Sequence, residues 1–126
     1  MSFDEKLREY AKLTVRLGGN VQPGQEVFLS CPVICPEFGR MIMEECYAAG
    51  AKEVIVNYYD EKASRIKFLN SPIEVFENVP AWERDRRITL ARKGAAMITV
   101  LAEDPEINAG VDGEKLLASA RSDIWF

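Results

Sequence analysis

The 126-residue sequence contains no histidine. This absence removes the commonest general base near neutral pH and the commonest protein ligand for metal ions. A serine nucleophile activated by histidine is excluded for the same reason, and no spacing in the sequence supports a serine–lysine pair. The side chains that remain as candidates for chemistry are three cysteines, a few adjacent carboxylates and one cluster of basic residues.

The three cysteines are Cys31, Cys35 and Cys46. Cys31 and Cys35 are separated by three residues, whereas redox-active dithiols usually have the C-x-x-C spacing. Structural zinc sites use four ligands, and only Cys46, which we expect to face the sheet, remains as a third sulfur. We therefore expect three free thiols that pack as small apolar side chains.

The charged candidates form short local groups. Glu44–Glu45 and Asp60–Glu61 are adjacent pairs, and adjacent helical residues point to different sides. We expect these carboxylates at solvated positions, with Asp60 as a helix N-cap. The sequence also contains a basic cluster, formed by Arg84, Arg86, Arg87, Arg92 and Lys93. The acidic residues Glu83 and Asp85 are interleaved with this cluster, which disfavours a phosphate or RNA site. We expect the neighbouring Trp82 to anchor packing.

Open α/β sheets bind ligands at the carboxyl ends of their strands. In this sequence those ends are predicted at residues 31–36, 58–61 and 102–105. The first of these loops contains no glycine, and two prolines remove amide donors that a nucleotide phosphate would need. Nucleotide binding is therefore disfavoured. Of Tyr58 and Tyr59, we expect one ring to pack and the other to be exposed.

The hydrophobic pattern predicts three short strands separated by helices. Strands are predicted over 26–31, 53–59 and 95–101, the second covered on both faces because its apolar run is continuous. Helices are predicted from the Ser2 cap to Gly18, from Pro36 to Gly50, from Asp60 to Ser71, from Pro80 to Lys93, and from Asp112 to about Ala120. A short apolar turn is predicted around residues 73–76.

Helical connections between strands favour right-handed crossovers and a parallel sheet. We expect a Rossmann-like α/β domain of three layers, with a small, mainly parallel sheet in the order 2-1-3 and helices on both faces. This single domain is predicted to span residues 1–126. In its first helix, we expect the apolar side to contain Phe3, Leu7, Tyr10, Ala11, Thr14, Val15 and Leu17.

Composition restricts the function classes further. Apolar residues make up 48% of the chain and charged residues 29%, with a net charge of −4. This acidic balance disfavours nucleic acid as a partner, and the apolar runs are too short to span a membrane. No signal-peptide pattern is present at the start. We expect a cytoplasmic protein whose thiols stay reduced.

Several segments, taken together in their order and spacing, resemble the opening of the thermophilic-type metal-dependent aminopeptidases, the M29 peptidase family. The segments are residues 3–11, 19–27, 48–54, 59–61, 80–82, 94–96, 103–105 and 110–116. The resemblance covers essentially the whole chain but only the amino-terminal portion of a family member. The apolar end at 124–126 is consistent with a chain that packs there or continues.

The resemblance implies the release of amino-terminal residues from peptides by two divalent metal ions, zinc, cobalt or similar. Because the family's ligands belong to a later, carboxy-terminal catalytic domain, we assign no catalytic, cofactor-binding or metal-binding residue to this chain and expect it to be inactive alone. Its implied partners are that catalytic domain, a peptide substrate and further copies in a homo-oligomer. The alternative is a free-standing small-molecule-binding or oligomerisation module.

Overall fold

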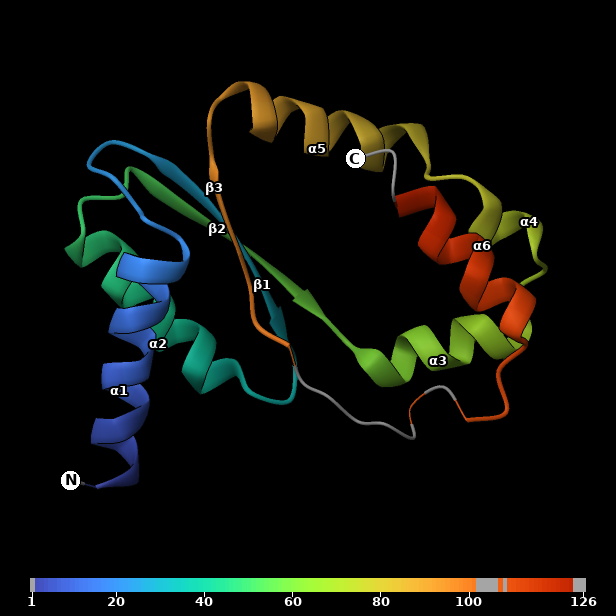
Figure 1. Cartoon of the computed structure of the whole chain (residues 1–126), viewed down its shortest axis with the longest axis horizontal. Helices are drawn as coiled ribbons and strands as arrows, with labels where there is room; N and C mark the ends of the chain where they lie inside the picture. The colour runs from blue at the N-terminus through green and yellow to red at the C-terminus, as the bar shows by residue number, and fades with distance from the viewer. Residues whose placement is uncertain (1, 102–106, 108, 124–126) are drawn as a thin grey trace. The chain divides into compact units, whose positions relative to one another are not determined.

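The computed structural model describes residues 2–101, 107 and 109–123 (Figure 1). Internal contacts divide the chain into two compact units. The first unit comprises Met1–Tyr59 and Leu90–Ala102, and the second comprises Asp60–Thr89 and Glu103–Phe126. The single domain over 1–126 stays a prediction.

The first unit contains a three-stranded parallel sheet. Its strands are β1 (Glu26–Pro32), β2 (Glu53–Tyr59) and β3 (Ala96–Thr99). The central strand is β1, which pairs with β2 on one side and with β3 on the other. The predicted α/β fold class, with a small parallel sheet in the order 2-1-3, is confirmed.

Two helices of the first unit lie side by side next to the sheet in Figure 1. They are α1 (Phe3–Leu13), which continues as the π-helical turn η1 (Thr14–Gly18), and α2 (Pro36–Ala48). The predicted cap is confirmed, because the Glu5 amide donates to Ser2 Oγ at 3.1 Å. The π-helical turn was not predicted.

The core of the first unit lies between these helices and one face of the sheet. Alternate side chains of β1 supply its centre, with Val27, Leu29 and Cys31 all 0% exposed, as the two-residue side-chain repeat of a strand requires. The other buried residues of the core are Ala11, Val15, Val21, Ile42, Cys46, Val54, Ala96 and Ile98. The expectation that Cys46 is buried toward the sheet is confirmed.

The expected coverage of β2 on both faces is wrong for most of the strand. Among its residues only Val54 is buried, and Ile55 and Val56 are half-buried. Strand β2 is less covered because it lies at the edge of the described sheet, with β1 on one side only. A continuous apolar run thus predicted the strand correctly but not its burial.

The second unit is built from helices. They are α3 (Glu61–Asn70), α4 (Glu74–Glu77), most of α5 (Ala81–Arg92) and α6 (Gly113–Asp123). The rings of Phe68 and Phe76 stack with centroids 4.6 Å apart, and Lys115 Nζ donates to the carbonyl oxygen of Phe68 at 3.0 Å. The short helix α4 forms where an apolar turn was predicted.

Candidate functional site

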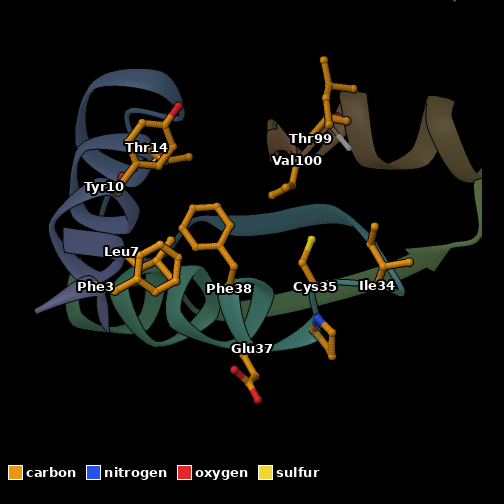
Figure 2. Close-up of a pocket in the computed structure, with 12 residues that line it drawn as sticks. Phe3, Leu7, Tyr10, Thr14, Ile34, Cys35, Glu37, Phe38, Thr99 and Val100 are labelled. Atoms are coloured by element: carbon orange, nitrogen blue, oxygen red, sulfur yellow. Dashed lines mark hydrogen bonds between the residues drawn. The ribbon is translucent and has the colours of Figure 1, made fainter. Parts of the chain in front are cut away.

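An apolar groove of about 780 Å³ opens in the first unit at the carboxyl ends of β1 and β3. It is the place where an open α/β sheet is expected to bind a ligand. Figure 2 shows the side chains that line it. They are Phe3, Leu7, Tyr10, Thr14, Ile34, Cys35, Pro36, Glu37, Phe38, Thr99, Val100 and Leu101.

One wall of the groove comes from α1 and η1. Phe3, Leu7, Tyr10 and Thr14 are alternately four and three residues apart, so they lie along one stripe of the helix. The Tyr10 ring contacts the Phe38 ring of α2, with centroids 5.8 Å apart. Thr14 Oγ1 donates to the carbonyl oxygen of Tyr10 at 2.9 Å. The threonine hydroxyl is therefore bonded within the helix.

Only part of the apolar side predicted for the first helix is buried. Ala11 and Val15 are buried as expected, but Phe3, Tyr10 and Leu17 are 75%, 62% and 78% exposed. The apolar stripe is wider than the surface that α2 and the sheet cover. The helical spacing predicted that these residues share one side of the helix but did not separate the exposed ones from the buried ones.

The opposite wall is the turn between β1 and α2. The Val33 amide donates to the Tyr59 carbonyl at 2.8 Å, and the Cys35 amide donates to the Pro32 carbonyl at 3.2 Å. These two amides are therefore occupied within the protein. With no amide at the prolines, the turn does not form a phosphate cradle.

The two tyrosines at the end of β2 behave as predicted. Tyr59 donates its hydroxyl hydrogen to the carbonyl oxygen of Val100 at 2.5 Å, whereas Tyr58 is 46% exposed. The bond links the ends of β2 and β3 beside the groove. The bond holds the backbone of Val100, whose side chain lines the groove (Figure 2).

The groove contains few groups that can react. Figure 2 shows the Glu37 carboxylate directed away from the Phe38 ring. Of the lining residues, only Cys35 carries a strong nucleophile, and it is half-buried. A single thiol beside apolar side chains offers neither a general acid–base pair nor a hydrolytic metal site.

Comparison with known proteins identifies the family. The family model for the thermophilic metalloprotease family M29 matches residues 3–123. The chain belongs to the M29 family. Aminopeptidase AmpS from Bacillus subtilis is 39% identical over 93% of this chain and 28% of its own length. Aminopeptidase PepS from Streptococcus thermophilus is 40% identical over 96% of this chain and 29% of its own length.

A solved structure agrees with this assignment. Wild-type AmpT from Thermus thermophilus superposes with a TM-score of 0.83 at 30% identity, over 96% of this chain and 30% of that protein. The predicted resemblance and fold are thus confirmed. This M29 chain spans less than a third of the length of the relatives that it matches.

The thiols of this M29 chain are all free. Burial raises the pKa of the Cys31 thiol to about 11, and the neighbouring Cys35 thiol adds to the increase. Burial also raises the pKa of Cys46 to about 11, with a smaller contribution from the Glu45 charge. Both buried thiols are therefore protonated near neutral pH.

The potential metal ligands outside the groove are dispersed. Among the side chains that the structure describes, no three of histidine, cysteine or carboxylate type gather closely enough to bind a metal ion. The predicted loop at 102–105 and the end at 124–126 lie outside the described residues. In the described part, no helix is long and apolar enough to cross a membrane.

Two of the carboxylates predicted as helix caps or solvated groups behave as expected. Asp60 caps α3, because the amides of Lys62 and Ala63 donate to its Oδ1 at 2.9 and 3.3 Å. Asp112 caps α6 in the same way, accepting from the Glu114 amide at 2.9 Å. Neither carboxylate forms part of the groove.

The prediction that Glu44 and Glu45 of α2 are both solvated is correct for Glu44 only. Glu44 is exposed, but the Glu45 side chain is 13% exposed and lies 3.5 Å from the Arg8 guanidinium. Arg8 reaches both carboxylates from α1. The pair thus stabilises the packing of the two helices.

Helix α5 presents one correction. Trp82 is 70% exposed, so the predicted packing anchor is wrong. Leu90 is the buried residue of this helix, and eight residues place Trp82 about 80° around the helix from it. The basic cluster is partly neutralised as predicted, since Glu83 pairs with Arg86 and Arg87.

Proposed function

We propose that this chain is the amino-terminal, non-catalytic part of a metal-dependent aminopeptidase. The observation that carries the proposal is the match to M29 aminopeptidases over nearly all of this chain but only 28–29% of their length. In such a protein, the catalytic carboxylates and histidines belong to the larger remaining part. Two divalent cations such as zinc or cobalt would activate water there and polarise the scissile carbonyl.

The chain's contribution in this proposal is structural. The absence of histidine from the sequence and of a metal-ligating group from its described residues agrees with a supporting role. The apolar groove gives this part a surface that faces either the catalytic domain or the peptide substrate. Its thiol and aromatic side chains would contact such a partner by packing, without taking part in hydrolysis.

A chimera tests the proposal. The matched 28% of Bacillus subtilis AmpS is replaced by this chain, and release of nitroaniline from aminoacyl-nitroanilides is measured with added cobalt or zinc. We expect the chimera to retain metal-dependent activity. A matched chimera with Leu29→Asp, which places a charge in the core, controls for folding of the replaced part. A folded but inactive first chimera would count against the proposal.

Self-association is a second element of the proposed function. Phe3, Tyr10, Leu13 and Leu17 are more than half exposed along α1 and η1, and apolar patches of this kind often mark protein interfaces. We expect the chain to form a homo-oligomer. Sedimentation velocity of the wild type and of Leu17→Ser tests this, and a purely monomeric wild type at high concentration would contradict it.

A small-molecule-binding module is the second candidate function. The observation that favours it is the volume of the groove, about 780 Å³, which lies within the range of pockets that hold drug-sized ligands. An apolar dye such as ANS should then bind the folded chain, and the Phe38→Ala substitution should abolish this binding. Binding that is unchanged by Phe38→Ala would place the dye elsewhere and exclude the groove.

A further inference from the structure

Two of the three cysteines lie together at the groove. Cys31 Sγ is 3.5 Å from the carbonyl oxygens of both Pro32 and Cys35. Cys35 Sγ is 3.8 Å from the same Pro32 oxygen, so both sulfurs lie close to one carbonyl group. The turn closed by the Cys35 amide and the Pro32 carbonyl brings residue 35 back toward the strand end. Both sulfurs are therefore held at one point of the backbone.

The two thiols differ in access. Cys35 lines the groove and is half-buried. In Figure 2 its sulfur points toward the part of the groove where Val100 lies. Cys31 is 0% exposed and does not line the groove. Gly39 leaves the space that Cys31 occupies, since a Cβ at this glycine would be 2.8 Å from Cys31 Sγ. One sulfur is thus open to a reagent and the other is packed beside it.

Cys46 provides a contrast within the same unit. It is also 0% exposed, but it belongs to the core between α2 and the sheet. Cys46 does not line the groove that Cys35 faces. Any reaction that depends on the Cys31–Cys35 arrangement should therefore leave Cys46 unchanged.

We propose that Cys31 and Cys35 are a reversible thiol–disulfide site at the groove, oxidised by small-molecule disulfides such as glutathione disulfide. The Cys35 thiolate attacks one sulfur of the reagent, forms a mixed disulfide and releases one reduced thiol. Cys31 then loses its proton to the departing small thiolate as its sulfur attacks Cys35 Sγ, which releases the second small thiol. Two protein thiols and one disulfide thus give one protein disulfide and two small thiols.

The bond would have a defined structural effect. It would join Cys31, the second-last residue of β1, directly to Cys35, the N-cap residue of α2. The groove would lose its thiol, and the turn at Val33 and Ile34 would be closed by a covalent link. This inference rests on the geometry of the thiols and is independent of the proposed aminopeptidase role.

Mass spectrometry of the intact chain and its tryptic peptides tests the site. Cys31 and Cys35 share the peptide 17–40, whereas Cys46 lies in the peptide 41–52. After folded protein is treated with glutathione disulfide, peptide 17–40 should lose two hydrogen atoms. Peptide 41–52 should keep an alkylatable thiol, and dithiothreitol should restore the first peptide. Peptide 17–40 with two alkylatable thiols would overturn the proposal.

Three variants assign the roles. Cys46→Ala should form the bond like the wild type. Cys35→Ser should stay fully reduced, because the accessible thiol is lost. Cys31→Ala should accumulate a glutathione adduct on Cys35, because no thiol resolves the mixed disulfide. A lasting glutathione adduct on wild-type Cys35 would overturn the proposal even if a cysteine variant fails to fold.

Discussion

The two units of the chain bury very different amounts of their own side chains. In the first unit, Val27, Leu29 and Ile42 are 0% exposed. In the second unit, α3 contains no buried residue, and its Ile66 and Leu69 are 62% and 48% exposed. The comparison indicates that the first unit holds a core of its own, whereas α3 is held by the Phe68–Phe76 stack, a few polar contacts and its cap, without a buried residue. Local stability should differ accordingly.

The largest expected difference between the units comes from truncating a core leucine. Leu29→Ala should lower the free energy of unfolding by about 3–4 kcal/mol, because a fully buried leucine leaves a cavity. Leu69→Ala, at a half-exposed position of α3, should cost less than about 1 kcal/mol. Urea unfolding followed by circular dichroism measures both. Equal losses would contradict the comparison.

High pH should destabilise the first unit through its buried thiols. The pKa values of Cys31 and Cys46 are raised to about 11, mainly by burial, above the ordinary thiol value of 9.0. The unfolded chain therefore loses these protons first. Each thiol's contribution is complete below about pH 9 and is lost between about pH 9 and 11, by up to about 3 kcal/mol.

The matched variant for this pH effect is Cys31→Ala with Cys46→Ala. Other groups, such as lysines and tyrosines, also titrate in this range, so the informative quantity is the difference between wild type and variant. Urea unfolding at pH 8, 9, 10 and 11 should show a steeper decline for the wild type. Parallel declines would mean that the two thiols titrate alike in the folded and unfolded states.

A smaller loss is expected at Gly39. Its substitution by alanine places a Cβ 2.8 Å from the buried Cys31 Sγ, and overpacking of this kind costs about 1–3 kcal/mol. Gly113→Ala, at the start of α6, meets no atom within 4 Å and should change the thermal midpoint little. A Gly39→Ala protein as stable as the Gly113→Ala protein would show that Cys31 moves freely.

The smallest of these effects is expected in the second unit, at the α3 cap. Asp60→Ala removes the acceptor for the Lys62 and Ala63 amides and should cost about 1 kcal/mol. Hydrogen exchange of these amides should become faster, while exchange in β1 stays constant. Asp60→Asn should retain most of the protection. Faster exchange in β1 as well would show that the units unfold together.

The strands and helix ends were predictable because their signals are local. The β2 bounds, Glu53–Tyr59, match the prediction because the apolar run ends at a capping residue, Asp60. The Ser2, Asp60 and Asp112 caps depend on side chains two or three positions from their amides. The order 2-1-3 followed from the parallel crossovers that helical connections impose.

Properties that depend on distant contacts were not predictable in the same way. The exposure of the Trp82 and Glu45 side chains was predicted wrongly because it depends on elements far along the chain, such as α1 for Glu45. The loop at 31–36 was expected at the site, but the α1 wall was not, since Phe3 and Tyr10 matched a core pattern equally well. Helical spacing predicts which apolar residues share one face of a helix, but it does not predict which element covers that face.

We expect this M29 chain to supply a fold and a groove and to hold no hydrolytic metal pair of its own. The most direct measurement is hydrolysis of an aminoacyl-nitroanilide by the purified chain, with cobalt or zinc retained after dialysis counted in the same sample. We expect neither turnover nor retained metal. Two retained metal ions per chain, with turnover that a chelator abolishes, would contradict it.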